Sequence, residues 1–137
     1  MVVYVEEVFE LAMGLLDELD DSGDAQNDST EEYENRAPGI LTSLLAELRL
    51  ANGDRGYFEP LEEADDPILG AEDSYALGVM PYGLAAALIA DENPTLAYFL
   101  EERYEELRDR FLVRREAVTE RIEDIYGGIE YGGFARW

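Results

Sequence analysis

The sequence contains no cysteine, no histidine and no lysine among its 137 residues. Without cysteine the chain has neither disulfides nor a thiol nucleophile, and without cysteine and histidine it lacks the usual ligands of zinc. Imidazole cannot serve as a general base, and a serine nucleophile would have no histidine or lysine beside it. These absences argue against an enzyme, and we expect neither catalytic residues nor a cofactor.

Positive charge is also scarce, since ten arginines stand against 33 acidic residues and give a formal net charge of −23. The composition therefore offers no basic patch for nucleic-acid phosphates, and attraction to anionic lipid is excluded for the same reason. Residues 1–68 carry −16 of this charge and residues 69–137 carry −7. The exclusive use of arginine favours bidentate carboxylate pairs at subunit contacts, or it reflects nucleotide bias in the source genome, and both explanations stay open.

The acidic stretches match no dedicated metal site. An EF-hand register anchored on Gly23 places Ser29 where the bidentate glutamate belongs, so we expect loose association of divalent ions and no metal ligand set. Carboxylate pairs are so abundant here that they carry no signal for acid–base catalysis. Gly53–Gly56 lacks the lysine of a phosphate-binding loop.

The longest run without charge is Ser74–Ala90, which contains Gly78, Pro81 and Gly83. It lies at the lower limit for a bilayer span and is interrupted by helix breakers. The first residues of the chain lack the basic region of a secretory signal. We interpret the run as a buried element of a soluble protein that has no membrane partner.

Apolar residues recur at helical spacing along most of the chain, and no segment alternates clearly with a period of two. The pattern predicts a first helix over residues 3–20 and an acidic loop after it. Ser29 and Glu32 fit a capping box that opens a second helix. We expect Pro38–Gly39 to interrupt that helix, and leucines at helical spacing then continue to a stop at Asn52–Gly53.

The second half begins with a loop over Gly53–Gly70 that is longer than ordinary connections and is typical of functional or mobile segments. Asp73–Ser74 caps a third helix that runs to about Ala90 and is apolar on nearly every face, so it must be surrounded. For Pro81 we favour a kink over the start of a separate helix. Asn93–Pro94 starts a last helix, whose apolar stripe fades only near its end.

Together these elements predict an all-α fold, a small bundle of four to five helices with a long acidic loop. Residues 1–125 form one helical domain with acidic loops at about 20–29 and 53–70, and residues 126–137 form a C-terminal arm. The arm holds four aromatic residues and four glycines. A disordered tail is normally poor in aromatics, so the arm needs an apolar surface to contact.

Two functions without catalysis fit these features. One is a structural assembly protein with an acidic surface. The other is an acidic DNA mimic that inhibits a nucleic-acid-binding protein by occupying its basic site. A mimic needs carboxylates at phosphate spacing and has no use for a glycine-hinged apolar arm, so the arm favours the assembly protein.

Several short blocks follow one another along the chain, namely Glu32-Tyr33 to Arg36-Ala-Pro-Gly-Ile40, Met80-Pro-Tyr-Gly-Leu-Ala-Ala86, Asp91-Glu-Asn-Pro94, Arg103-Tyr-Glu-Glu106 and Asp124-Ile-Tyr-Gly-Gly-Ile129. In this order they resemble head–tail connector (adaptor) proteins of tailed phages and prophages of Gram-positive bacteria. The resemblance covers the chain from about residue 30 onwards and includes no catalytic motif. It implies a virion subunit, assembled in the host cytoplasm, that forms a homo-oligomeric ring beneath the portal protein. The ring would also contact neighbouring neck or tail proteins, and duplex DNA would pass through it without specific binding.

The resemblance also implies contact residues, because a terminal arm of such connectors reaches the portal or a neighbouring copy. The residues in question here are Tyr126, Gly127, Gly128, Ile129, Tyr131, Phe134 and Trp137.

An acidic surface fits a DNA channel, since arginine or lysine on its wall would release counterions and bind the duplex. The candidate channel-lining residues are Asp20, Asp21, Asp24 and Asp28 in the first loop and Glu62, Glu63, Asp65 and Asp66 in the second. Alternatively, acidity keeps the free subunit soluble and monomeric before assembly. Both explanations stay open at this point.

Overall fold

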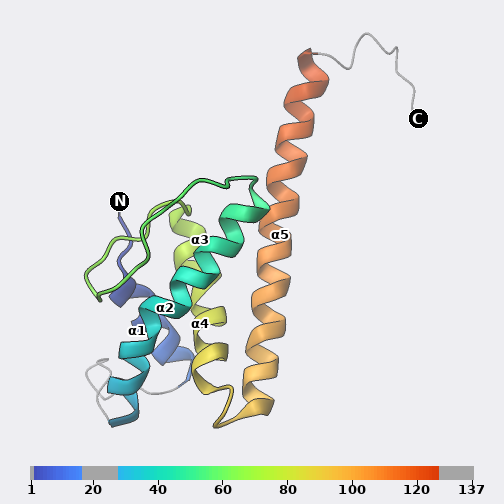
Figure 1. The fold of residues 1–137 in the computed structure, drawn as a ribbon. Helices are drawn as coiled ribbons and strands as arrows, with labels where there is room; N and C mark the ends of the chain where they lie inside the picture. The colour runs from blue at the N-terminus through green and yellow to red at the C-terminus, as the bar shows by residue number, and fades with distance from the viewer. Residues whose placement is uncertain (1, 17–27, 127–137) are drawn as a thin grey trace.

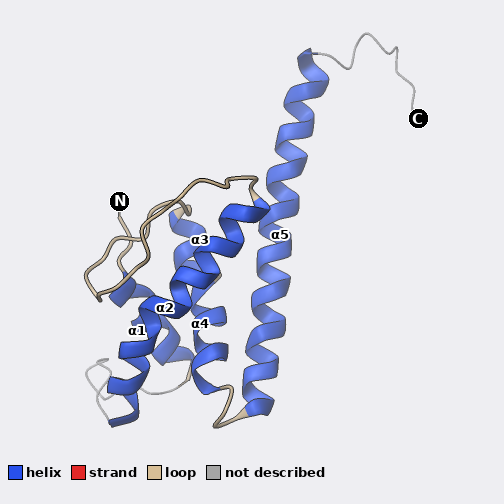
Figure 2. Cartoon of the chain, viewed as in Figure 1, coloured by secondary structure: helices blue, strands red, loops and turns tan. Residues whose placement is uncertain are grey.

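The computed structural model describes residues 2–16 and 28–126, with side chains placed over 2–16 and 30–113. This part of the chain contains five helices and no strand beyond an isolated antiparallel bridge between Tyr4 and Pro67 (Figure 2). The helices are α1 (Val5–Leu15), α2 (Asp28–Ala51), α3 (Asp73–Gly78), α4 (Met80–Ile89) and α5 (Pro94–Tyr126). The predicted all-α fold is confirmed. None of the helices described is both long enough and apolar enough to cross a membrane.

Helix α4 lies at the centre of the body, with α1, α2 and α5 packed around it (Figure 1). Eight of its ten residues are buried, as the apolar run predicted. Gly83 marks the closest approach, because a Cβ at this position would lie 3.0 Å from side-chain carbons of both Leu44 and Tyr104. Burial of a helix on all its faces removes much apolar surface from water and holds its three neighbours together.

Helix α2 is continuous over 24 residues and contains Pro38, so the predicted interruption at Pro38–Gly39 is wrong. A proline inside a helix removes a backbone donor and costs about 3 kcal/mol. Here Ala37 and Leu41 are fully buried on either side of it, and their packing offsets that cost. The Pro38 carbonyl also accepts a hydrogen bond from Thr42 Oγ1 at 2.8 Å.

The two ends of α2 differ in how well the sequence predicted them. The helix begins at Asp28, so Ser29 lies inside its first turn and not at the predicted cap. At the other end Gly53 has a φ of 82°, a conformation that favours glycine. The backbone N–H groups of Gly53 and Asp54 donate to carbonyls of the last turn at 3.0 and 2.8 Å, which confirms the predicted stop.

The region predicted as one apolar helix forms two helices, α3 and α4, that meet at Val79. The favoured kink at Pro81 is therefore wrong. Pro81 lies in the first turn of α4, where backbone N–H groups have no partner within the helix and proline loses nothing. Glu72 precedes the first residue of α3, one position before the predicted Asp73–Ser74 cap.

Helix α1 is shorter than the predicted range of 3–20, since it begins at Val5 and ends at Leu15. The helix begins two residues later than predicted, because the residues before it are extended and pair with the loop that follows α2. The carbonyl of Val3 accepts a hydrogen bond from the N–H of Ile68 at 2.8 Å. The predicted loop after α2 is confirmed, and this pairing ties it to the N-terminal segment.

Helix α5 begins as predicted, because Asn93 Oδ1 accepts a hydrogen bond from the N–H of Leu96 at 3.1 Å. Its apolar stripe packs on the body, and Leu100 and Tyr104 are buried. With 33 residues at 1.5 Å each the helix is about 50 Å long. Its C-terminal part continues well beyond the other four helices (Figure 1).

Candidate assembly surfaces

The acidic tip of the second loop carries the predicted residues Glu62, Glu63, Asp65 and Asp66. The first three are exposed, whereas Asp66 is half-buried. The Asp66 carboxylate accepts hydrogen bonds from the backbone N–H groups of Glu62 at 2.7 Å and Glu63 at 2.9 Å. These two bonds hold the pKa of Asp66 below its usual value. Asp66 therefore shapes the turn, and the other three carboxylates face solvent.

The tip brings carboxylate oxygens of Glu63, Asp65 and Asp66 within 4.8 Å of one another. Such a cluster on an exposed loop concentrates negative charge. The other predicted acidic cluster lies mostly outside the described residues, since Asp20, Asp21 and Asp24 fall in the gap after residue 16. Asp28 is the first residue of α2, and its side chain is not described.

The predicted arm also lies outside the described residues, except at its start. Tyr126 is the last residue of α5, and Gly127, Gly128, Ile129, Tyr131, Phe134 and Trp137 follow it in the undescribed part of the chain. The end of α5 lies away from the helical body (Figure 1).

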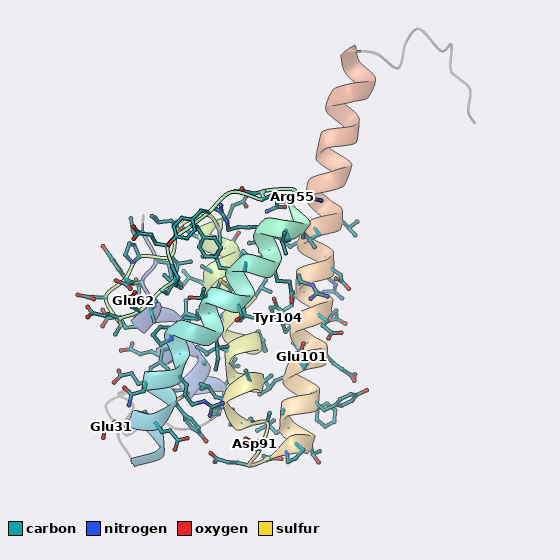
Figure 3. The ribbon with its side chains drawn as sticks, viewed as in Figure 1. Glu31, Arg55, Glu62, Asp91, Glu101 and Tyr104 are labelled. Atoms are coloured by element: carbon teal, nitrogen blue, oxygen red, sulfur yellow. The ribbon has the colours of Figure 1, made fainter. Side chains whose placement is uncertain are left out.

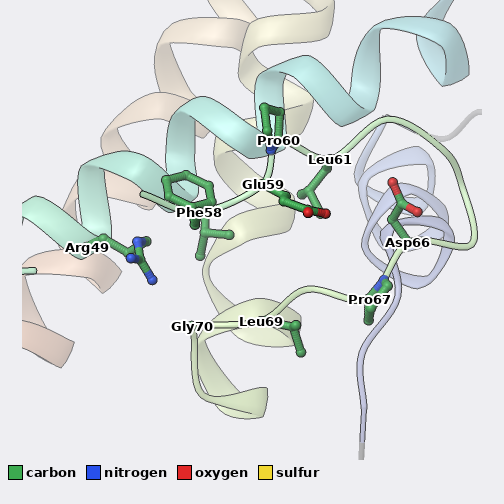
Figure 4. A pocket seen from close by; sticks show the side chains of 10 residues that line it. Arg49, Phe58, Glu59, Pro60, Leu61, Asp66, Pro67, Leu69 and Gly70 are labelled. Carbon is green, nitrogen blue, oxygen red and sulfur yellow. The ribbon is translucent and has the colours of Figure 1, made fainter. Parts of the chain in front are cut away.

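The loop after α2 encloses a hollow of about 300 Å³ against α2 (Figure 4). Its apolar wall is formed by Leu45, Phe58, Pro60, Leu61, Pro67 and Leu69. Leu69 is 67% exposed at its edge. The Arg49 guanidinium lies 4.6 Å from the centre of the Phe58 ring and 2.9 Å from the Asp54 carboxylate, so its charge is already balanced.

A second hollow, of about 390 Å³, adjoins the first and shares Glu59, Pro60 and Asp66 with it. Its remaining walls are Tyr57 and Glu62. Tyr57 is 84% exposed, so its ring is open to a partner. Arg49 and Asp66 lie at opposite ends of the first hollow (Figure 4). The second hollow is acidic because Glu59, Glu62 and Asp66 line it and no arginine does. Sequence reasoning did not single out Tyr57 or Glu59, because only the folded loop places them together.

The sequence also contains a local exception to its negative charge. Residues 108–115 hold four arginines and a single acid, Asp109. Arg108 pairs with Glu47 and Asp109, and the Arg110 guanidinium lies 3.8 Å from the Glu106 carboxylate. This segment begins on the body and continues into the projecting part of α5. Within it the Arg110 side chain is 69% exposed and Val113 is 62% exposed.

A polar joint between α2 and α5 sets the direction in which α5 leaves the body. The Glu47 carboxylate accepts hydrogen bonds from the Tyr104 hydroxyl at 3.1 Å and from Arg108 Nη1 at 2.6 Å. The Tyr104 and Tyr75 hydroxyls lie 3.5 Å apart, and Tyr104 points from α5 into the body (Figure 3). Burial, followed by the Tyr75 and Glu47 contacts, raises the pKa of Tyr104, so it stays a neutral donor.

No protein-family model, no curated protein and no solved structure matches this chain. Its function therefore has to be inferred from the chemistry of its own residues.

Proposed function

We propose that this protein is a subunit of a ring-shaped structural assembly, the head–tail connector beneath the portal of a tailed phage. The observation that carries the proposal is the projecting part of α5, which leaves the body as a lone helix (Figure 1). The short sequence blocks that resemble connector proteins support it independently.

The projecting part of α5 needs a partner on physical grounds. A helical segment from Val113 to Tyr126 is marginal on its own in water, because most helical stability in proteins comes from packing. The sequence keeps apolar residues at helical spacing along this segment, at Val118, Ile122 and Ile125. Such a segment is typical of a helix that packs against another chain.

A second apolar surface lies at the start of α5. Tyr98 and Phe99 are both exposed, and their rings meet edge to face with centroids 6.5 Å apart. Large aromatic side chains are typical anchors of protein interfaces. Two separate apolar surfaces on one subunit suit a ring, in which each copy contacts neighbours and the portal.

The acidity of the chain suits a DNA conduit, because carboxylates on a channel wall repel the phosphates of a passing duplex. A ring repeats each acidic position in every copy, so weak single repulsions add up. Glu63 and Asp65 are the described candidates for such a wall, since both are exposed and neither lines a hollow.

The test is to mix the purified protein with the portal protein of its phage and to image the product by negative-stain electron microscopy. We expect a ring with an axial channel stacked on the portal. A chain that ends at Tyr126 should keep its helical circular dichroism signal and fail to dock. In the assembled ring, Glu63→Arg with Asp65→Arg should create salt-dependent binding of duplex DNA.

Two results would contradict the proposal. One is a protein that stays monomeric at high concentration and in the presence of the portal. The other is a tight one-to-one complex with a DNA-binding enzyme, which would instead support the acidic DNA mimic.

A further inference from the structure

We infer that the two adjoining hollows in the loop after α2 receive the basic part of α5 from a second copy of this chain. The inference rests on the proposed ring and names the contact that closes it. It follows from the chemistry of the two hollows, from the charge of the segment that would fill them and from the direction of α5.

The hollows offer two different kinds of surface side by side. The first is walled by apolar side chains, with Leu69 exposed at its edge. The second presents the carboxylates of Glu59 and Glu62 beside the exposed ring of Tyr57. A fitting occupant therefore carries an apolar side chain close to one or more arginines, since a guanidinium pairs with carboxylates and stacks on an aromatic ring.

The basic part of α5 carries such a combination. In the sequence Arg110 lies three residues before the exposed Val113, and Arg114 and Arg115 follow Val113 directly. Residues 108–115 have a net charge of +3, whereas the whole chain has a net charge of −23. Arg108 is held by Glu47 within its own chain, whereas the Arg110 guanidinium lies 3.8 Å from Glu106 and is 69% exposed, so it can also reach another copy's carboxylates.

The occupant has to come from another copy because of how α5 is built. No α5 residue lines either hollow. The helix is continuous from Pro94 to Tyr126 and runs past the body, so it does not turn back onto its own loop (Figure 1). The two contacting surfaces differ, and a contact between different surfaces propagates from copy to copy and closes into a ring when the rotation allows.

Charge reversal on each side of the contact tests the inference. One variant carries Glu59→Arg and Glu62→Arg, and the other carries Arg110→Glu and Arg114→Glu. Asp66 is left unchanged because its carboxylate shapes the loop. In sedimentation equilibrium at low salt, we expect each variant alone to self-associate about tenfold more weakly than the wild type or worse. An equimolar mixture of the two should recover association.

The first variant separates a specific contact from a general charge effect. It reduces the net negative charge, so general electrostatics predicts stronger self-association, whereas the inferred contact predicts weaker. A matched control with Glu31→Arg and Glu34→Arg makes the same change of charge at two exposed positions near the start of α2. Figure 3 shows Glu31 at the end of α2 away from Glu62. The control should associate at least as well as the wild type.

Assembly that both reversed variants retain would overturn this contact and leave the proposed ring intact. Equal loss in the Glu31 and Glu34 control, or a mixture that fails to recover association, would overturn it as well. A wild type that stays monomeric at low salt and with the portal would instead show that the proposed function has failed. Circular dichroism of each variant confirms that it is folded.

Discussion

The two halves of α5 obtain their stability in different ways. The first half lies against α4, with Leu100 and Tyr104 buried, and the Phe111 ring meets Tyr75 edge to face at 5.0 Å. The second half runs beyond the body (Figure 1). One uninterrupted helix thus joins a packed segment to a projecting one. The difference teaches that continuity of a helix does not imply continuity of the packing that stabilises it.

The strongest test of this difference removes the anchor of the first half. Tyr104 is 1% exposed, and its ring fills the space that Gly83 leaves between α4 and α5. We expect Tyr104→Ala to lower the free energy of unfolding by about 3–5 kcal/mol, as for other large aromatic truncations. Urea unfolding followed by circular dichroism measures the change.

Tyr104→Phe is the matched control for this variant, because it keeps the ring and loses only the hydroxyl contacts to Glu47 and Tyr75. Its expected cost is about 0.5–1.5 kcal/mol. An alanine variant as stable as the phenylalanine variant would mean that packing of the ring does not hold the first half of α5.

A smaller effect on the monomer is expected from removing the second half. A chain that ends at Val113 should unfold within about 0.5 kcal/mol of the full chain at a concentration where both are monomeric. The helical signal per molecule should fall, because the removed residues 114–126 are helical. A large loss of stability would show that the projecting half packs on its own body, contrary to its position here.

The smallest effect concerns one carboxyl on the first half. Partial burial, followed by a hydrogen bond with Glu105, raises the pKa of Glu101. A raised pKa in the folded state gives stability that is present at low pH and is lost as the pH rises through that pKa. Glu101→Gln should therefore slightly raise the melting temperature at pH 7.

The pH dependence gives this prediction its test. The gain from Glu101→Gln should vanish below about pH 4, where the glutamate is protonated in both states. Glu31→Gln, which removes one exposed carboxylate from α2, is the matched control. A gain that is the same at pH 4 and pH 7 would contradict the pKa as its cause.

Signals carried by neighbouring residues correctly predicted the helix ends that depend on those residues alone. Asn93–Pro94 and Gly53 marked helix ends correctly, because a cap or a left-handed glycine acts within one turn. Pro38 was misjudged because its cost is local, whereas the burial of Ala37 and Leu41 that offsets it depends on α4.

The candidate contact surfaces were harder to predict than the helices. The first hollow combines residues of α2 with residues of the loop, and the second is lined by loop residues alone. No spacing in the sequence signals that these residues meet. The basic segment could have been found, since four arginines within residues 108–115 are visible in the sequence. It is easily overlooked because the net charge of −23 averages over the whole chain.

The bridge between the N-terminal segment and the loop has a consequence for the order of synthesis. Val3 leaves the ribosome long before its partner Ile68, and translation proceeds at about 5–20 residues per second. During that interval the N-terminal segment lacks the loop partner that it has in the folded chain. Helix α1 packs on α4, which is synthesised later, so the N-terminal segment and α1 reach their final places only after α4 has been made.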